Sequence, residues 1–377
     1  MSNDKIYVGT DHISYPQIRN FIGLPFEKYK HIKTFNLFKI PDHLIYRMFD
    51  RTNKFYHFSH YDSINKKVKL YHFFDTISFG RKPWVTTFET FVPYWDKEKS
   101  KLYEFGIKKI ASSSCIKLIA ISKCSHNIMK EIIQDNYYHY YDEIEDKISV
   151  LHPAQKLLFD NYDEKEKFLE NEYITFTFVG SSFWRKGGGE LLKSFDKLLD
   201  TKYPIKLNII SKLDTGDYIT KSDINDRENA LKIISKHQGR IQLFSYLSND
   251  SVLDMLKKTH VCVLPTLQDS YGYFVLEAQA AGCPVITTDI RALSEINNNE
   301  AGWLIKTKKM GSPQITTNRT KISELINIRL ESIIKSIVEN PNQIKQKGIQ
   351  SINRIRECHN PYDKVSFLGN IYDEVAG

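Results

Sequence analysis

Two carboxylates, Asp269 and Glu277, follow the apolar run 260–266 and have Gly272 between them. The pattern predicts a strand that ends before Asp269 and a helix that begins near Gly272. The first amides of a helix have no partner within it, and a glycine lets a bound group approach the backbone, so this helix start favours a phosphate. Glu277 can accept two hydrogen bonds from a vicinal diol such as a ribose, and Asp269 can accept them from hydroxyls of a group attached to the phosphate. The segment therefore predicts a nucleotide-sugar site.

A second loop of the same kind carries Arg185 and Lys186, between the apolar run 173–180 and a helical pattern over 189–200. Glycines follow the two cations directly. Lys186 can neutralise a departing diphosphate as a point charge, and Arg185 can bind it with a planar fork. A flexible basic surface loop would contain the same residues, but the carboxylates of the first segment favour the diphosphate interpretation.

The elements that position these residues follow from a regular alternation of strand and helix patterns in the second half of the chain. The predicted strands are short apolar runs rich in β-branched and aromatic residues, which is typical of strands buried on both faces. They cover 173–180, 205–211, 240–246, 260–266, 284–289 and 302–305. Helical patterns lie between them at 189–200, 228–239, 248–258 and 273–282. This alternation predicts a parallel, doubly wound sheet, which binds ligands at the carboxyl ends of its strands.

The first half of the chain is also α/β, with a less regular pattern and an irregular start that receives no assignment. Strands are predicted at 68–77, 83–90, 116–122 and 147–153, and a helix at 124–135. The acidic stretch 159–172 has the composition of a linker. Two further helices are predicted at 321–340 and 344–358. Because 377 residues are too many for one ordinary core, we expect two doubly wound domains with a cleft between them.

Residues 176–306 resemble the donor-binding domain of the retaining GT-B glycosyltransferases of group 1, a family that includes bacterial lipopolysaccharide, capsule and mannosyl transferases. That family has the frame P-S-x-x-E-x-F/Y-G-x-x-x-x-E-A-x-A-x-G-x-P-V. This chain matches it at Pro265, Thr266, Asp269, Tyr271, Gly272, Glu277, Ala278, Ala280, Gly282, Pro284 and Val285. Gly180, Lys186 and Gly187 match the family's glycine and lysine element, and weaker matches lie at 119–122 and 147–153.

The resemblance implies roles for individual residues. Glu277 is expected to bind the ribose, Asp269 the hydroxyls of the donor sugar, and Lys186 the diphosphate. Glu89 is expected in the acceptor-side cleft, either to orient or deprotonate the acceptor hydroxyl or as a structural carboxylate. The expected catalytic set is Asp269, Glu277, Lys186 and Glu89. The expected donor-binding set is Gly180, Ser181, Arg185, Lys186, Ser211, Lys212, Leu247, Asp269, Ser270, Tyr271, Gly272, Tyr273, Phe274 and Glu277.

Three positions depart from the family. Asp269 replaces the commoner Glu, which shortens the side chain by one methylene. Ser181 stands where the family often has Arg, and Arg185 is expected to supply that charge. Glu89 stands where many relatives have His. His60, His72 and His126 are further polar residues expected near the cleft, and a structural role explains each of them more readily.

The resemblance also implies the GT-B fold and its domains: an N-terminal acceptor-binding domain over 1–165, a nucleotide-sugar-binding domain over 172–345, and C-terminal helices over 346–377 that return to the N-terminal domain. The implied activity is that of a hexosyltransferase. It would move a sugar from a nucleoside diphosphate to a hydroxyl of a glycan or lipid-linked acceptor, with retention, in cell-surface polysaccharide or glycoconjugate synthesis. Because the sequence has no Asp-x-Asp motif, we expect no metal and no cofactor besides the donor.

Composition and charge bear on location and partners. The longest apolar runs are far shorter than a membrane span, the N-terminus shows no signal peptide, and the five cysteines contain no C-x-x-C pair, so we expect a cytoplasmic protein. Residues 1–150 hold 23 Lys and Arg against 17 Asp and Glu, and many of the 22 Tyr and 22 Phe. This basic, aromatic half favours an acceptor presented at the inner face of an anionic membrane, although an ordinary solvated surface explains it equally well.

Other classes of function remain open from the sequence. A nucleotide-sugar epimerase of the same fold would turn over the donor without an acceptor. A non-catalytic partner would bind the nucleotide-sugar without turnover, which the three departures favour. A nucleic-acid-binding protein is disfavoured because the basic excess is diffuse and no recognised motif is present. A dinucleotide dehydrogenase is disfavoured because no G-x-G-x-x-G follows the first apolar segment.

Overall fold

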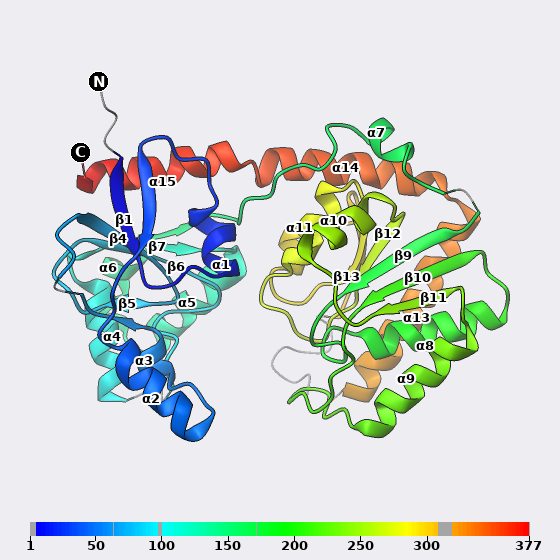
Figure 1. Ribbon diagram of the computed structural model, residues 1–377, viewed down its shortest axis with the longest axis horizontal. Helices are drawn as coiled ribbons and strands as arrows, with labels where there is room; N and C mark the ends of the chain where they lie inside the picture. The colour runs from blue at the N-terminus through cyan, green and yellow to red at the C-terminus, as the bar shows by residue number, and fades with distance from the viewer. Residues whose placement is uncertain (1–4, 63, 97–99, 171, 308–318, 377) are drawn as a thin grey trace. The chain divides into compact units, whose positions relative to one another are not determined.

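The structure is a computed structural model that describes residues 5–62, 64–96, 100–170, 172–307 and 319–376 (Figure 1). The chain divides into two compact units. The N-terminal unit contains residues 1–154 and 359–377, and the C-terminal unit contains residues 155–358. The domains expected from the sequence were 1–165 and 172–345, with C-terminal helices over 346–377.

The C-terminal unit is built on a parallel six-stranded sheet in the order β11-β10-β9-β12-β13-β14. Its strands are β9 (Ile174–Val179), β10 (Ile205–Ile210), β11 (Ile241–Phe244), β12 (Val261–Leu264), β13 (Val285–Thr288) and β14 (Gly302–Ile305). Every residue of β12 and β13 is buried, as expected for central strands with helices on both faces. All six strands lie within the predicted ranges.

The helices of the C-terminal unit alternate with these strands. They are α7 (Tyr162–Glu166), α8 (Gly188–Asp200), α9 (Ile224–Lys236), α10 (Asn249–Lys257), α11 (Tyr273–Ala280), α12 (Leu293–Ile296), α13 (Arg319–Glu339) and α14 (Asn342–Cys358). Polar caps begin several of them: the Ser248 hydroxyl accepts from the Ser251 amide at α10, and Asp223 and Asp226 form a reciprocal capping box at α9.

The acidic stretch that resembled a linker contains α7, which is anchored in the C-terminal unit. Lys165 is fully buried, and its ammonium donates to the carbonyl oxygens of Leu256 and Lys257 and to the sulfur of Cys283, at 3.1, 3.4 and 3.2 Å. These carbonyls end α10, where a cation satisfies the free acceptors of the last turn. The composition of this segment is that of a solvated linker, because composition does not reveal that Lys165 is buried.

The N-terminal unit has a second parallel six-stranded sheet, in the order β2-β1-β4-β6-β7-β8. Its strands are β1 (Ile6–Thr10), β2 (Tyr29–Lys33), β4 (Val68–Phe74), β6 (Trp84–Phe88), β7 (Cys115–Ala120) and β8 (Ile148–Val150), and a separate pair joins β3 (Ser59–His60) to β5 (Ile77–Ser78). Two such units confirm the predicted α/β fold of paired doubly wound domains.

Helices complete the N-terminal unit, including the irregular start that the sequence left unassigned. They are α1 (Tyr15–Gln17), the π-helix η1 (Ile18–Ile22), α2 (Lys39–Phe49), α3 (Lys54–His57), α4 (Lys101–Ala111), α5 (Lys123–Asn136), the 3₁₀ turn η2 (Tyr138–Tyr140), α6 (Tyr141–Glu145) and α15 (Pro361–Ala376). None of the helices in the described ranges has the length and hydropathy of a membrane span.

The last helix, α15, packs against β4 of the N-terminal sheet (Figure 1), so the end of the chain returns to this unit as predicted. Tyr372 makes polar contacts between the helix and the sheet. The Tyr372 hydroxyl lies 2.5 Å from Nδ1 of His72 and 3.1 Å from Nε2 of His31. Nε2 of His72 lies 2.8 Å from the Thr87 hydroxyl, so both ring nitrogens are satisfied. Burial lowers the pKa of His72 well below its usual range, so the ring is neutral near pH 7.

We expect Tyr372→Phe to reduce the free energy of unfolding by about 1–3 kcal/mol, because it leaves a buried His72 nitrogen without its partner. Urea denaturation of the full chain measures the effect. Tyr362→Phe is the matched control, because Tyr362 lies on the same helix and its side chain is exposed. Equal midpoints for the two variants would contradict the role of Tyr372.

Candidate functional site

Two loops at the carboxyl edge of the C-terminal sheet are tied together, one after β9 and one after β12. The Leu267 amide and the Thr266 hydroxyl both donate to the carbonyl oxygen of Arg185, at 2.9 and 3.2 Å. The Arg185 guanidinium donates back to the Gln268 carbonyl at 2.9 Å and to the Ser182 hydroxyl at 3.2 Å. Because β9 and β12 are neighbours in the sheet, these loops begin side by side.

Lys186 and Asp269 meet across the two loops. The Lys186 ammonium lies 3.3 Å from Oδ2 of Asp269, and the side chains are 20% and 13% exposed. This Oδ2 accepts no hydrogen bond from the described residues, so the lysine is the partner that neutralises it. An anionic group of a ligand can take the place of the Asp269 carboxylate as the partner of Lys186. The structure therefore brings together the predicted diphosphate-binding cation and the predicted sugar-binding carboxylate.

Glycine is required directly before α8 and directly before α11. Gly187, which precedes α8, has φ of +78°, and a Cβ there would lie 2.1 Å from the Pro265 carbonyl oxygen. Gly272, the first residue before α11, has φ of +92°, and a Cβ there would lie 2.6 Å from Cδ2 of Leu293. Both positions are closed to other residues by backbone conformation and by space. Gly187, from the glycine and lysine element, and Gly272, from the family frame, therefore both shape the site.

Helix α11 carries Glu277 as predicted, and the carboxylate is largely buried. Tyr271 and Phe274 are buried beside the helix start, and Ser270 and Tyr273 are half-buried. The α11 amides that follow Gly272 include the first-turn donors predicted to meet a phosphate. The segment from Asp269 to Glu277 thus has the predicted loop-to-helix geometry.

The remaining predicted donor residues lie at the same edge of the sheet. Gly180 follows β9 and donates its amide to the Ile210 carbonyl, and Ser181 beside it is exposed. Ser211 is buried at the end of β10, with Lys212 exposed next to it. Leu247 follows β11 and is half-buried. Their contact with a base stays a prediction.

Glu89 belongs to the N-terminal unit, where it directly follows β6. Its amide donates to Oδ1 of Asp75 at 2.9 Å, and its carbonyl accepts from the Ser125 hydroxyl at 2.6 Å. Burial and the charge of Glu89 raise the pKa of Asp75 well above its usual range. Sequence reasoning missed Asp75, although its place after a buried strand matches that of Asp269 after β12.

The three histidines named from the sequence have different surroundings. His72 is the buried ring held by Tyr372 and Thr87. Nε2 of His126 lies 3.0 Å from the Glu145 carboxylate. His60 is fully buried, neither ring nitrogen has a hydrogen-bond partner among the described residues, and burial lowers its pKa to about 4. A structural role fits His72 and His126.

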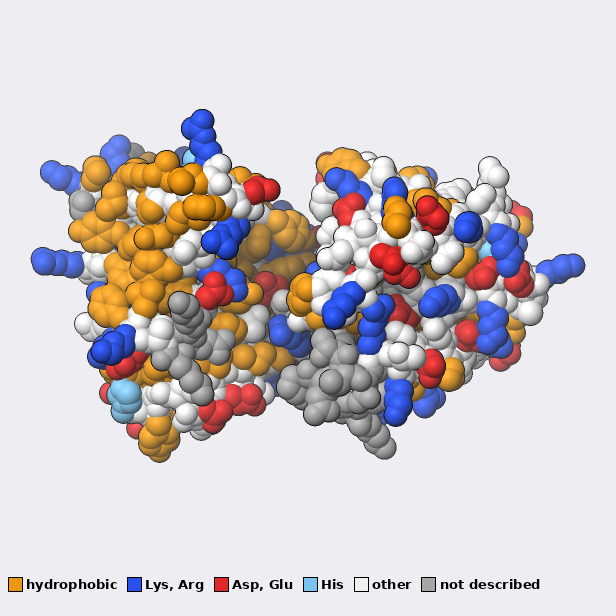
Figure 2. Space-filling view, turned by 90° about the horizontal axis from the view of Figure 1, so that it is seen from below, with side chains coloured by type: hydrophobic (Ala, Val, Ile, Leu, Met, Phe, Trp, Pro, Cys, Tyr) orange, Lys and Arg blue, Asp and Glu red, His pale blue; other side chains and the backbone are white. Residues whose placement is uncertain are grey.

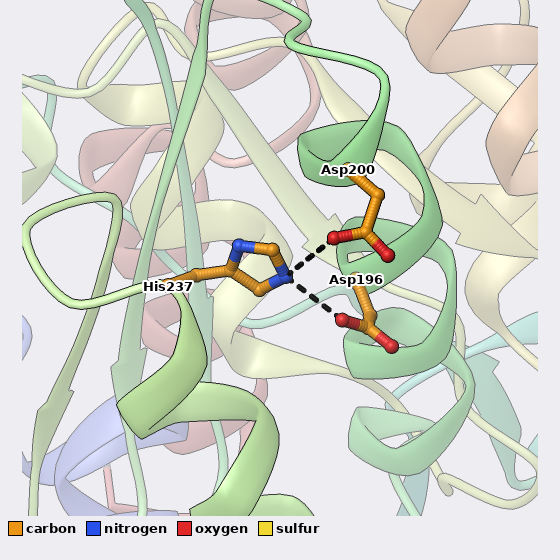
Figure 3. A group of neighbouring side chains, drawn as sticks. All are labelled: Asp196, Asp200 and His237. Atoms are coloured by element: carbon orange, nitrogen blue, oxygen red, sulfur yellow. Dashed lines mark hydrogen bonds and ion pairs between the residues drawn. The ribbon is translucent and has the colours of Figure 1, made fainter.

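One group of side chains has the composition of a metal site: Asp196, Asp200 and His237 (Figure 3). Nε2 of His237 lies 2.8 Å from Asp196 and 3.8 Å from Asp200. The ammonium of Lys236 also lies 2.8 and 2.7 Å from these two carboxylates, so a protein cation already neutralises them. Asp200 ends α8, which begins at the carboxyl edge, so the group lies toward the opposite edge of the sheet. We assign it as a salt-bridge network.

The part of the chain that contains this site is similar to known proteins. Residues 160–316 match the family model of the glycosyl transferases group 1. The capsular polysaccharide biosynthesis glycosyltransferase CapM of Staphylococcus aureus is 28% identical over 210 residues. That match covers 53% of this chain and 50% of CapM, so the similarity spans about half the length of this curated relative.

Solved structures agree on the fold of the whole chain. A glycosyltransferase from Rickettsia africae has a TM-score of 0.62 at 14% identity and covers 99% of both chains. The pneumococcal O-GlcNAc transferase GtfA, solved with UDP and GlcNAc, has a TM-score of 0.56 at 13% identity over 81% of this chain and 56% of its own. The matched family model, the curated relative and the shared fold agree with the motif frame around Asp269 and Glu277. Residues 160–316 therefore match the glycosyl transferases group 1, and the chain as a whole has the two-domain GT-B fold of the solved glycosyltransferases.

Proposed function

We propose that this protein transfers a sugar from a nucleoside diphosphate to a hydroxyl of an acceptor. The observation that carries the proposal is the pairing of Lys186 with Asp269 across the loops after β9 and β12. The site thus holds one cation for phosphate and one carboxylate for hydroxyls, in a region that matches the glycosyl transferases group 1. GtfA, whose structure contains UDP and GlcNAc, supports a donor of this class.

The chain's own residues would bind the donor in three places. Lys186 would leave Asp269 and pair with the diphosphate, and the released carboxylate would accept hydrogen bonds from sugar hydroxyls. The α11 amides after Gly272 would add dipoles aimed at the phosphates. Glu277 would accept the two ribose hydroxyls. Arg185 would act mainly by holding both loops, because its guanidinium is engaged by Gln268 and Ser182.

Catalysis would come from position and electrostatics. As the bond to the sugar breaks, negative charge grows on the leaving diphosphate, where Lys186 and the helix amides stabilise it. Retention of configuration is part of the proposal and rests on the family resemblance. The name of CapM supports a place in polysaccharide synthesis.

The acceptor would meet the N-terminal unit, and we propose that an anionic membrane presents it. Hydrophobic side chains gather on the face of this unit seen in Figure 2. Large apolar side chains of α2 and nearby segments are exposed, among them Ile40, Leu44, Met48 and Phe49. Arg47 and Arg51 are exposed in the same stretch. An apolar surface flanked by cations favours the interface of an anionic bilayer.

We expect Lys186→Ala and Glu277→Gln each to weaken UDP-sugar binding or turnover by about tenfold or more, because each removes a charge-assisted contact worth about 1.5–3 kcal/mol. Calorimetric titration of a panel of UDP-, GDP- and ADP-sugars, followed by steady-state kinetics, measures the effect. Lys232→Ala and Glu228→Ala are matched controls, because both residues are exposed on α9. Near-normal kinetics in both site variants would refute the proposal.

We expect turnover to persist in excess EDTA, because a lysine and helix amides take the place of a metal at the diphosphate. Initial rates with and without the chelator test this. Activity that disappears with EDTA and returns with Mn²⁺ or Mg²⁺ would show that a divalent ion holds the diphosphate instead.

We expect Leu44→Glu combined with Met48→Glu to lower binding to vesicles with one third anionic lipid at least tenfold, because two charges enter the exposed apolar face of α2. Co-sedimentation at low salt measures binding. Tyr138→Glu is the matched control, since Tyr138 is equally exposed on another part of the same unit. Failure of the unmodified protein to sediment with anionic vesicles would remove the membrane from the proposal.

A further inference from the structure

A cavity of about 640 Å³ lies within the N-terminal unit, between the ends of β1 and β2 and the first turns of α2. Its polar lining includes Asp11, His12, Lys33 and Lys39, and its apolar lining includes Ile40 and Leu44. The strand ends place it at the carboxyl edge of this sheet, where doubly wound folds bind ligands. It is large enough for a small organic ligand.

Asp11 is the unusual group in this cavity because it is buried and half-satisfied. The residue is 2% exposed. Its Oδ2 lies 3.1 Å from Nδ1 of His12 and 3.2 Å from the Thr76 hydroxyl, and the Lys39 ammonium is 3.9 Å away. Its Oδ1 accepts no hydrogen bond from any described residue. A buried carboxylate oxygen without a donor calls for one from outside the protein, and a ligand hydroxyl in the cavity would supply it.

The rest of the lining points to a negative charge on the same ligand. Lys33 is exposed at the cavity, and the Lys39 ammonium is partly exposed while it donates to the His57 carbonyl at 2.6 Å. His12 and His43 add two further nitrogen-bearing side chains. Against these groups the lining contains a single carboxylate, that of Asp11. An anionic group, such as phosphate, would be bound by the two lysines.

We propose that this cavity binds a phosphorylated polyol, with a hydroxyl donating to Oδ1 of Asp11 and the phosphate held by Lys33 and Lys39. Such a group would be the head of the acceptor, and that assignment rests on the proposed function. Ile40 and Leu44 line the same cavity and are exposed, so a hydrocarbon chain attached to the head can continue along α2. The lysines would bind any phosphate, and Asp11 would add affinity only for a phosphate that carries a neighbouring hydroxyl.

Calorimetric titration of the full chain with sn-glycerol 3-phosphate, inorganic phosphate and glycerol tests the assignment. We expect glycerol 3-phosphate to bind about tenfold more tightly than inorganic phosphate, and Asp11→Asn to remove that difference. Lys33→Gln should weaken both ligands, and because Lys33 is exposed this variant tests the site even if Asp11→Asn impairs folding. Lys69→Gln, at an exposed position of β4, should change neither.

A short-chain phosphatidylglycerol, kept below its micelle-forming concentration, distinguishes a lipid head from a soluble phosphate. If it binds more tightly than glycerol 3-phosphate and Leu44→Ser removes only that gain, the phosphorylated polyol belongs to a lipid. If the two ligands bind equally, the same chemistry comes from a soluble or glycan-borne phosphate.

The inference fails if glycerol 3-phosphate shows no saturable binding up to about 10 mM, or if Asp11→Asn and Lys33→Gln both bind it as the unmodified protein does. Titration with UDP on the same sample separates this outcome from failure of the proposed function. Retained UDP binding without glycerol 3-phosphate binding overturns only the cavity assignment. The reverse result leaves a phosphopolyol site in a protein that is not a UDP-sugar transferase.

Discussion

The ion pair between Lys186 and Asp269 depends on one topological constraint, which is that neighbouring parallel strands end at the same edge of a sheet. The two residues are 83 positions apart in sequence, yet β9 and β12 are adjacent, so their loops begin together. The backbone hydrogen bond from Leu267 to Arg185 and the close approach at Gly187 then hold the loops against each other. The pair is therefore a property of the fold as much as of the two side chains.

The same constraint operates in the N-terminal unit. Asp11 follows β1, Asp75 follows β4 and Glu89 follows β6, so three acidic residues stand at one carboxyl edge. Each has a different environment: burial and the charge of Glu89 raise the pKa of Asp75 well above its usual range, whereas His12 and Lys39 lower the pKa of Asp11 despite its burial. Burying a protonated carboxyl group costs little free energy of folding. Burying an ionised carboxylate costs much more unless cations surround it.

The sequence predicted the C-terminal unit more completely than the N-terminal unit, for a physical reason. Strands such as β12 and β13 are buried on both faces, so every residue is apolar or small and the pattern is unambiguous. The edge strand β2 contains two lysines and a histidine, and one of its five residues is buried, so no apolar pattern marks it. The motif frame predicted the places of Asp269, Gly272 and Glu277, because a turn from a loop into a helix depends on residues that are close in sequence.

Groups defined by distant contacts could not be predicted from spacing. Tyr372 meets His72 across 300 positions, and Lys165 reaches the end of α10 from a segment whose composition suggested a linker. The cavity at Asp11 depends on where α2 lies against the sheet ends, and the sequence before residue 68 gave no assignment. These features follow from tertiary packing, which a single sequence does not encode locally.

The N-terminal unit is discontinuous along the chain, because α15 completes it after the whole C-terminal unit has been passed. During synthesis on the ribosome, the strands of this sheet are made before α15, so His72 receives its tyrosine only after residues 155–358 have been made. The second unit, continuous from 155 to 358, can assemble earlier. Completion of the first unit therefore depends on residues that follow the second unit in the chain.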